Sequence, residues 1–198
     1  MKKIGLTGGI ASGKSTVSRV LGEMGARIID ADLLAREALM PGTDAYRATV
    51  RLFGRRILSS DGHIDRKALG DIVFRDHEKR SVLEGVVHPE IFRREAEIVG
   101  GIMANEPGAL VIFDAALLIE SGAWRRMDGL IVVWCRKETQ VERLIKNCRL
   151  TPEEALLRIE AQMPLDEKKK YASWIIDNDG DVSAAIRQTE EIYRKLTE

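Results

Sequence analysis

The chain has 198 residues, a length typical of one compact domain with a buried core. Its 31 basic and 31 acidic residues give a net charge of zero, so no overall field attracts nucleic acid or an anionic membrane surface. Aromatic residues are only 5% of the chain, which argues against a surface that stacks the bases of single-stranded nucleic acid. We therefore expect neither nucleic acid nor a membrane as a partner.

The first segment with a chemical signature is the run GLTGGIASGKSTV at residues 5–17. It matches the pattern G-x-x-x-x-G-K-[ST], which begins here at Gly8 and ends at Ser15. Apolar residues over 4–6 predict a short buried strand before it. The apolar positions after it repeat at the spacing of one helix face: Val17, Val20, Leu21 and Met24. A glycine-rich turn between a strand and a helix N-terminus presents backbone N–H groups that bind phosphate.

In this arrangement Lys14 is expected to reach the β- and γ-phosphates of a bound nucleotide, and the Ser15 hydroxyl is expected to bind Mg²⁺. A glycine-rich turn that only joined two elements would not require a Lys-Ser pair at this offset. We therefore interpret the segment as a phosphate-binding loop. The residues predicted to bind the nucleotide are Gly9, Ala11, Ser12, Gly13, Lys14, Ser15 and Thr16.

Targeting and redox signals are weak. Lys2 and Lys3 followed by residues 4–11 resemble a secretory signal only faintly, because glycines and a threonine interrupt the apolar run. No segment approaches the roughly 18 apolar residues of a membrane span. The two cysteines, Cys135 and Cys148, have no metal-binding spacing, and we interpret them as reduced thiols of a cytoplasmic protein.

Strand-like and helix-like segments alternate along the rest of the chain. Further strands are predicted at 27–29, 110–113, 130–135 and 174–176. Helices are predicted at 33–39, after Thr43, over 66–103 with a break at His88-Pro89, and over 182–196. This alternation predicts an α/β fold with a parallel sheet and helices on both faces, the architecture of P-loop NTPases.

Several acidic residues follow the predicted strands: Asp30, Asp32, Asp114 and Asp177. Ligands of such sheets gather at the carboxyl ends of the strands, where an acid could bind Mg²⁺ or accept a proton from an attacking hydroxyl. Each acid could instead cap the following helix. For Asp177 we favour a structural role, since an Asn-Asp-Gly turn follows it. Spacing alone does not choose between Asp30 and Asp32.

These residues together resemble the dephospho-CoA kinase family over essentially the whole chain. The matching segments are LTGGIASGKSTV, IIDADLLAR, PGT, FG, DGHIDRKAL, IVF, HPEI, ALLIESG, QMPLDEKKKYA and IIDNDG. Many nucleotide enzymes share the phosphate loop, whereas the DAD-x-x-A-R block and the HP-x-I step are far more specific. The resemblance implies a kinase that uses ATP to phosphorylate the ribose 3′-hydroxyl of dephospho-CoA, giving coenzyme A and ADP in the last step of coenzyme A biosynthesis.

The resemblance also implies roles for single residues and segments. The catalytic residues would be Asp32, as base or orienter of the 3′-hydroxyl, with Lys14 and Arg143, and the substrate-binding residues Asp32, Arg36 and His88. Residues 41–105 would form a helical substrate-side subdomain and 151–172 a lid whose cations, Arg158 and Lys168–Lys170, face anionic ligands. The core would comprise roughly residues 1–40, 106–150 and 173–198. We expect a monomer.

Other interpretations remain open at this point. Arg36, Arg158 and the 168–170 lysines could be solvated surface residues, and His88 a packed structural histidine. A kinase for another small metabolite or nucleotide would share the loop. A GTP-dependent switch protein would need an Asn-Lys-x-Asp segment, and the chain contains no Asn-Lys pair. The chain departs from many relatives at Ala116, at 147–148 and at Ser173, where a proline, an Arg-Asp pair and an aspartate are common.

Overall fold

The computed structural model describes residues 1–73 and 76–198. Phe74, which ends the IVF segment, therefore lies outside the described residues. The chain forms two compact units, one of residues 1–30 and 102–198 and one of residues 31–101. The predicted division into core, substrate-side region and lid stays a prediction.

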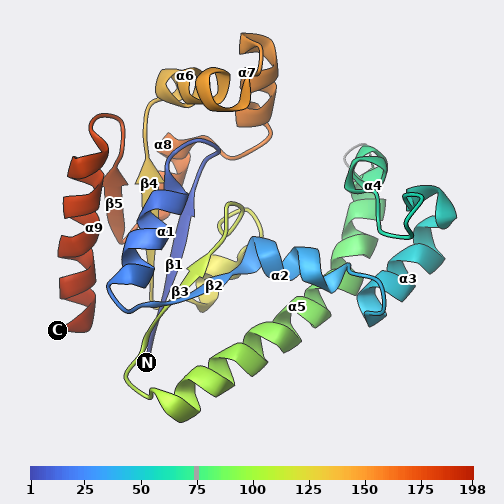
Figure 1. Cartoon of the computed structure of the whole chain (residues 1–198), viewed down its shortest axis with the longest axis horizontal. Coiled ribbons are helices and arrows are strands. Elements are labelled where there is room, and N and C mark those ends of the chain that lie inside the picture. The colour runs from blue at the N-terminus through green and yellow to red at the C-terminus, as the bar shows by residue number, and fades with distance from the viewer. Residues whose placement is uncertain (74–75) are drawn as a thin grey trace. The chain divides into compact units, whose positions relative to one another are not determined.

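The first unit is built on a five-stranded parallel sheet in the order β2-β3-β1-β4-β5 (Figure 1). Its strands are β1 Lys2–Gly8, β2 Arg27–Asp30, β3 Leu110–Asp114, β4 Gly129–Trp134 and β5 Trp174–Asp177. Strands β2 and β3 lie on one side of β1 in the sheet, and the later strands β4 and β5 lie on the other side. The carboxyl end of β1 is thus the point where strand order reverses, which is where such sheets bind ligands. The predicted parallel α/β fold is confirmed.

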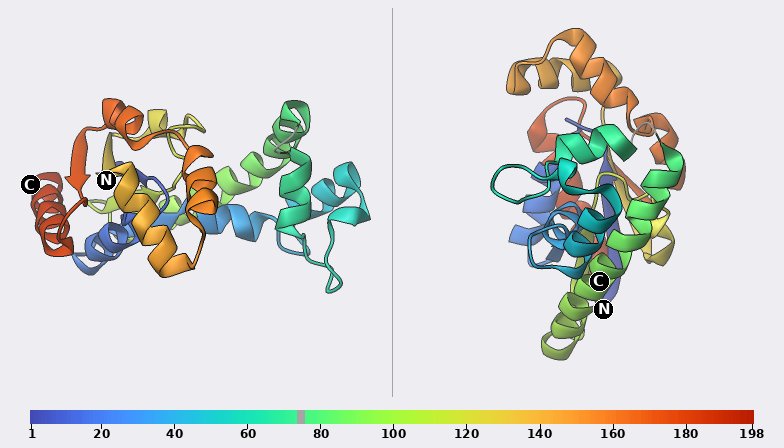
Figure 2. Two further views of the ribbon diagram at one scale, coloured as in Figure 1. Left: turned by 90° about the horizontal axis from the view of Figure 1, so that it is seen from above. Right: turned by 90° about the vertical axis from the view of Figure 1, so that its right-hand side faces the viewer.

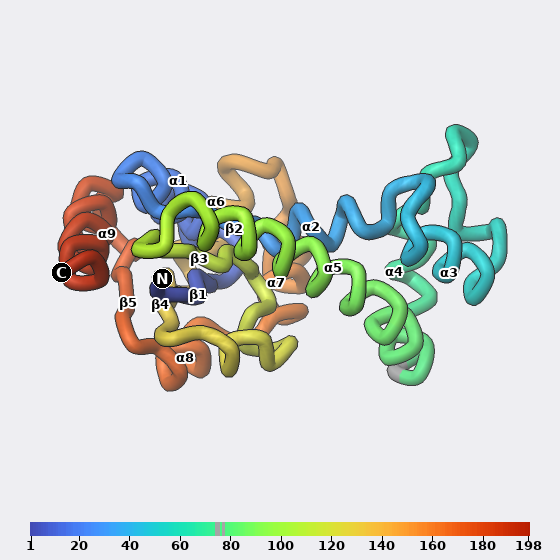
Figure 3. Tube along the Cα trace, turned by 90° about the horizontal axis from the view of Figure 1, so that it is seen from below, coloured from blue at the N-terminus to red at the C-terminus, as the bar shows by residue number. Residues whose placement is uncertain are grey.

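Helices cover both faces of this sheet. Helices α1 Lys14–Glu23 and α9 Val182–Thr197 lie side by side on one face, whereas α8 Leu165–Lys168 lies on the other (Figures 2 and 3). The α1 and α9 face buries a continuous apolar cluster that includes Leu6, Val17, Leu21, Ile131, Ile176 and Ile192. Each such side chain contributes about 1.5–3 kcal/mol on burial. This packing fixes both β1 and α1, and therefore the loop between them.

Two further helices of this unit, α6 Lys137–Cys148 and α7 Pro152–Glu160, pack on each other through Leu144, Ala155 and Ile159. The Thr151 hydroxyl and the Glu154 carboxylate form a reciprocal capping box at the start of α7. Short 3₁₀ helices lie at η2 Ala123–Arg126 and η3 Lys169–Tyr171. The segment from 151 to 172 is therefore largely helical, as predicted.

The second unit contains α2 Ala31–Ala38, α3 Asp44–Phe53, η1 Arg55–Ile57, α4 Arg66–Val73 and most of α5 His77–Asn105. Its core is formed by Phe53, Ile57, Ile64 and Leu69. The Thr43 hydroxyl accepts a hydrogen bond from the Tyr46 backbone N–H at 3.0 Å, which confirms the predicted cap of α3. Within the part of the chain that the structure describes, no helix is long and apolar enough to cross a bilayer.

Two predicted helix boundaries were wrong. Helix α2 begins at Ala31 rather than Leu33, so Asp32 lies inside its first turn. Helix α5 does not break at His88-Pro89 but includes the proline within 29 helical residues. A proline removes one helical hydrogen bond and crowds the carbonyl four residues earlier, which here belongs to Gly85. The remaining bonds of a helix this long outweigh that loss.

The two cysteines give a test of the described core. Cys135, after β4, is buried, and burial raises the pKa of its thiol to about 11 despite the opposing charge of Arg143. Cys148 is exposed at the end of α6. Because the thiolate is the reactive form, we expect Ellman's reagent at pH near 8 to modify Cys148 in the native protein and Cys135 only after unfolding. Rapid reaction of a native Cys148→Ser variant would contradict this.

Candidate functional site

The loop between β1 and α1 has a backbone that few residues adopt. Gly13, which precedes the first residue of α1, has φ +93°, and Ala11 has φ +58°. No side chain caps α1, so its first backbone N–H groups keep their hydrogen-bonding capacity for a ligand. A helix N-terminus with such donors and a partial positive charge binds phosphate.

At two of the loop glycines a polar side chain lies so close that a Cβ atom would fit only if that side chain moved. A Cβ atom on Gly9 would lie 2.6 Å from Gln140 Nε2, well inside contact distance. A Cβ atom on Gly13 would overlap Asn178 Nδ2 outright. Gly13 therefore serves both the positive φ of the loop and the close approach of Asn178, whereas Gly9 serves the close approach of Gln140.

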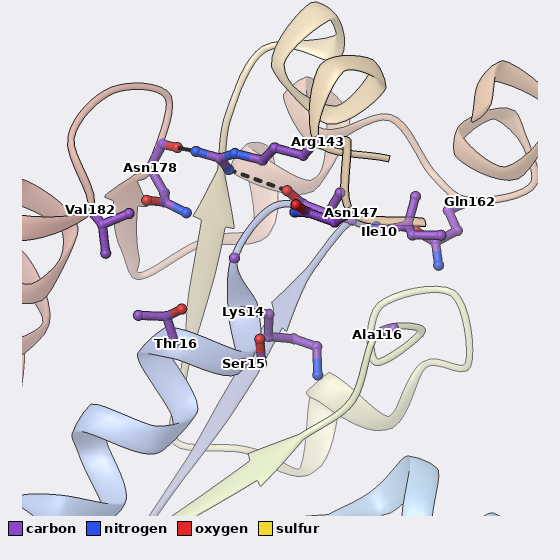
Figure 4. Close-up of a pocket in the computed structure, with 13 residues that line it drawn as sticks. Ile10, Lys14, Ser15, Thr16, Ala116, Arg143, Asn147, Gln162, Asn178 and Val182 are labelled. Carbon is purple, nitrogen blue, oxygen red and sulfur yellow. Dashed lines mark hydrogen bonds between the residues drawn. The ribbon is translucent and has the colours of Figure 1, made fainter. Parts of the chain in front are cut away.

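Arg143 and Asn178 hold the carbonyl side of the loop (Figure 4). The Arg143 guanidinium donates to the Ala11 carbonyl at 3.2 Å and to the Asn178 backbone carbonyl at 2.7 Å. The Asn178 side-chain amide donates to the Ser12 carbonyl at 2.7 Å. In a trans peptide the next N–H points opposite to the carbonyl. The Gly13 N–H is therefore directed away from Asn178.

Two glutamines hold the peptide groups on either side of Ile10. Gln140 Nε2 donates to the Ile10 carbonyl at 2.6 Å, and the Ile10 N–H donates to Gln162 Oε1 at 2.8 Å. Gln140 lies on α6 and is buried, whereas Gln162 lies between α7 and α8. The loop is thus tied to the 151–172 segment as well as to the sheet.

The turn after β5 keeps Asn178 in place through two aspartates. Asp177 Oδ1 accepts from the Asp179 backbone N–H at 2.9 Å, in agreement with the structural role favoured for Asp177. The Asp179 carboxylate accepts from the Thr139 hydroxyl at 2.6 Å and from the Arg136 backbone N–H at 2.8 Å. These bonds, the Thr139 bond foremost, hold the pKa of Asp179 below its ordinary value. Asn178 is therefore supported by a charged, hydrogen-bonded turn.

Lys14 forms an ion pair with Asp114. Asp114 ends β3, and the register of the sheet places it beside Leu6 of β1. The two side chains are 19% and 8% exposed, so the pair is partly screened from water. Asp114 thus lies at the carboxyl edge of the sheet, within reach of the lysine predicted to contact phosphates.

A cavity of about 500 Å³ opens beside these residues (Figure 4). The phosphate loop contributes Gly9, Ile10, Ala11, Gly13, Lys14, Ser15 and Thr16 to its lining. The opposite walls come from Ala116, Arg143, Asn147, Gln162, Asn178 and Val182. This volume falls in the range of small-molecule and cofactor sites.

Most of the predicted nucleotide-binding residues therefore lie together. All of them line the cavity except Ser12, which is fully buried behind the loop. Arg143 also lines it, and its guanidinium supports the loop backbone. Asp32, Arg36 and His88 belong to the second unit, and their roles stay predictions. In that unit Arg36 is exposed, and the His88 ring lies 5.8 Å from the Phe92 ring.

Sequence reasoning missed some residues of this site and named others without singling them out. Asn178 was part of an Asn-Asp-Gly turn, which is a structural signal. Asp114 was one of four strand-ending acids and had no mark that set it apart. Gln140 and Gln162 lie more than 120 residues from the loop they hold, and no local pattern distinguishes them from other polar residues.

The three lysines of the predicted lid differ in their placement, and Lys170 is exposed and pairs with Glu167, as the solvated-surface interpretation expects. Lys168 is fully buried and contacts Glu120 and the Ala116 carbonyl, so it is neither a solvated residue nor directed at a ligand. Lys169 pairs with Asp166, and its ammonium lies 4.1 Å from the centre of the Trp134 ring.

Comparisons with known proteins agree with this geometry. The family model described as dephospho-CoA kinase matches residues 2–184. A dephospho-CoA kinase from Geobacter sulfurreducens is 50% identical over 195 residues, which cover 98% of each chain. The crystal structure of TT1252 from Thermus thermophilus superposes with a TM-score of 0.86 at 36% identity, covering 100% of this chain and 98% of that one. A dephospho-CoA kinase structure from Campylobacter jejuni gives a TM-score of 0.71 at 28% identity with the same coverage.

Replacing Gly13 by alanine tests the loop geometry. The new Cβ would overlap the Asn178 amide and would impose a positive φ on an L side chain, a strain of roughly 1–3 kcal/mol. We expect the affinity for a non-hydrolysable ATP analogue, measured by calorimetry, to fall by about tenfold or more. In the control Gly108→Ala the Cβ meets nothing within 4 Å, and the affinity should not change. Unchanged affinity in Gly13→Ala would refute the described loop.

Proposed function

The chain belongs to the dephospho-CoA kinase family, and we propose that it transfers the γ-phosphoryl group of ATP to the ribose 3′-hydroxyl of dephospho-CoA. The products are coenzyme A and ADP, and the reaction is the last step of coenzyme A biosynthesis. The observation that carries this proposal is the phosphate loop, whose carbonyls accept hydrogen bonds from Arg143 and Asn178. The chain that contains this loop matches the family model over residues 2–184.

The loop binds the phosphates of ATP in this proposal. Backbone N–H groups at the start of α1 donate to phosphate oxygens, and Lys14 contacts the β- and γ-phosphates. Lys14 is paired with Asp114 at the edge of the same cavity, so its ammonium is already held near the site. Holding the charge in place before the ligand arrives reduces the reorganisation that transfer requires.

The donor set fits a magnesium ion carried by the nucleotide. Mg²⁺ binds one or two protein oxygens and completes its shell with phosphates and water. Among the described residues no cluster of three His, Cys, Asp or Glu side chains could hold a metal by itself. Ser15, in the first turn of α1, and Asp114 provide a hydroxyl and a carboxylate at this edge of the sheet. Bound Mg²⁺ would neutralise charge on the β- and γ-phosphate oxygens.

We propose Asp32 as the residue that takes or orients the proton of the 3′-hydroxyl. The hydroxyl oxygen forms a bond to the γ-phosphorus, the bond from that phosphorus to the β,γ-bridging oxygen breaks, and its electron pair leaves with ADP. The hydroxyl proton moves to the Asp32 carboxylate. Support comes from the DAD-x-x-A-R resemblance and from the position of Asp32 in the first turn of α2, two residues after β2 ends.

Arg143 has two proposed roles. It shapes the cavity by holding the Ala11 and Asn178 carbonyls, and its charge lies beside the transferring phosphoryl group. The Arg-Asp pair of many relatives is replaced here by Asn147-Cys148, and Asn147 lines the cavity with a neutral amide. We therefore assign to Arg143 a larger share of the charge stabilisation in this chain.

The remaining assignments concern the binding of dephospho-CoA, the oligomeric state and the localisation of the protein. We propose that Arg36 and His88 bind dephospho-CoA, that residues 41–105 form the substrate-side region, and that 151–172 act as a lid. The tie between Gln162 and Ile10 supports a link between that segment and the phosphates. We also propose that the enzyme is monomeric and cytoplasmic. The zero net charge supports only the absence of nucleic acid and anionic membrane surfaces as partners, because no overall field attracts them.

A coupled assay of ADP release tests the proposed reaction. We expect turnover with ATP and dephospho-CoA, and little with adenosine or other nucleosides. Lys14→Met should abolish turnover, because it removes the charge directed at the β- and γ-phosphates. The surface variant Lys195→Met, whose exposed lysine pairs with the neighbouring Glu191, should retain full activity. Near-normal turnover by folded Lys14→Met protein, or preference for another acceptor, would overturn the proposal.

A pair of variants separates Asp32 from Asp30. Asp32→Asn should keep ATP binding and lower single-turnover rates by roughly 10²–10⁴-fold, the loss typical of a general base. Asp30→Asn should cost less rate, because Asp30 is still part of β2 and aligns with Asp114 in the sheet. If Asp30→Asn proves the slower enzyme, or if Asp32→Asn loses only nucleotide affinity, the assignment of the base is wrong and the kinase function still stands.

A further inference from the structure

Lys168, the last residue of α8, is a charged side chain with no exposed surface. Its ammonium donates to the Ala116 carbonyl at 2.7 Å and pairs with Glu120 Oε1 at 2.9 Å. Removing an ammonium from water costs several kcal/mol even after relaxation, and only well-placed partners offset that cost. A methionine of similar length would fill the same space without this penalty, so stability alone does not explain a lysine here.

The first partner of Lys168 is the carbonyl of Ala116, a residue in the wall of the phosphate-loop cavity. Ala116 lines that cavity, and its carbonyl also accepts from the Thr7 hydroxyl at 3.1 Å. Thr7 is fully buried on β1, one residue before the strand ends at Gly8. Two donors from different elements therefore fix the carbonyl of this wall residue.

The second partner of Lys168 leads back to the phosphate loop. Glu120 Oε1 also accepts from the Met163 backbone N–H at 3.1 Å. The residue before Met163 is Gln162, whose side-chain oxygen accepts from the Ile10 N–H at 2.8 Å. A continuous series of hydrogen bonds and one ion pair thus joins the buried ammonium, through Glu120 and the 162–163 backbone, to the loop.

We propose that Lys168 is a positioning residue for phosphoryl transfer. Its ammonium holds the Ala116 wall directly, and through Glu120 it holds the 162–163 segment that keeps Gln162 on Ile10. The inference rests on the proposed function and extends it to a residue that contacts neither phosphate nor acceptor. Loss of the charge lets the Ala116 wall and the Gln162 contact move together.

The proposal predicts that loss of Lys168 lowers the rate of phosphoryl transfer much more than it weakens the binding of ATP. Ile10 keeps its contact with Gln140 when Gln162 is released, so the loop still binds ATP. Transfer depends on alignment more sharply than binding does, since a displacement of about 1 Å can cost about 10²-fold in rate. The effect of losing Lys168 should therefore appear mainly in kcat, with a much smaller change in the KM for ATP.

The experiment compares the full-length wild-type chain with Lys168→Met, Glu120→Gln and the double variant, with Lys195→Met as the surface control. Rates and thermal stability are measured together, and rates are taken at a temperature where every variant is folded. We expect kcat of Lys168→Met to fall about 10–100-fold. Glu120→Gln removes the charge but keeps an acceptor for the Met163 N–H, and should also lower kcat. The double variant should lose less than the product of the two single losses, because the residues act in one network.

A purely structural role predicts a different result. If Lys168→Met melts earlier but keeps wild-type kcat and KM in the folded state, the proposal is overturned. If Lys168→Met fails to fold, Glu120→Gln decides, and unchanged kcat in that variant also overturns it. The proposal is also overturned if the loss of kcat in the double variant equals the product of the two single losses. Failure of the proposed function is distinguishable, because then the wild-type protein itself would not phosphorylate dephospho-CoA. Failure of this inference would leave wild-type turnover intact and would remove only the differences in kcat between the variants and the wild type.

Discussion

The structure depends on one constraint: a short stretch of backbone must present its N–H groups to a ligand. Each N–H is rigidly opposed to a carbonyl across the peptide plane, so the carbonyls need donors on the protein side. Gln140, Asn178 and Arg143 supply them from α6 and from the turn after β5. The glycines at 9 and 13 allow these side chains to approach so closely. Loop and supports therefore form one unit.

Charge is distributed locally in a chain with no net charge. Lys14 pairs with Asp114 at the edge of the cavity, whereas Lys168 pairs with Glu120 and contacts Ala116, a residue that lines the cavity. The Ala116 carbonyl joins the two regions, because both Thr7 and Lys168 donate to it. Hydrogen bonds from two buried donors therefore restrain the backbone at Ala116.

The elements that could be predicted are those set by local patterns. The phosphate loop, the five strands, the Thr43 cap and the closing helix were read from periodicity and capping residues, and the structure confirms them. The predicted break at His88-Pro89 was wrong, because proline preference acts on one hydrogen bond while a helix of 29 residues has many others. The preference of a single residue against helix is overridden where the rest of the helix forms more hydrogen bonds than that residue removes.

The parallel α/β fold and the position of the phosphate loop could be predicted from the order of residues alone, because both follow from the spacing of apolar and glycine residues along the chain. Only the tertiary structure decided which distant polar residues support that loop. Gln140, Gln162 and Asn178 reach it from more than 120 residues away, and Lys168 looked like one member of a surface lysine run. Burial and hydrogen-bond partners depend on how the elements pack, and no local pattern contains that information.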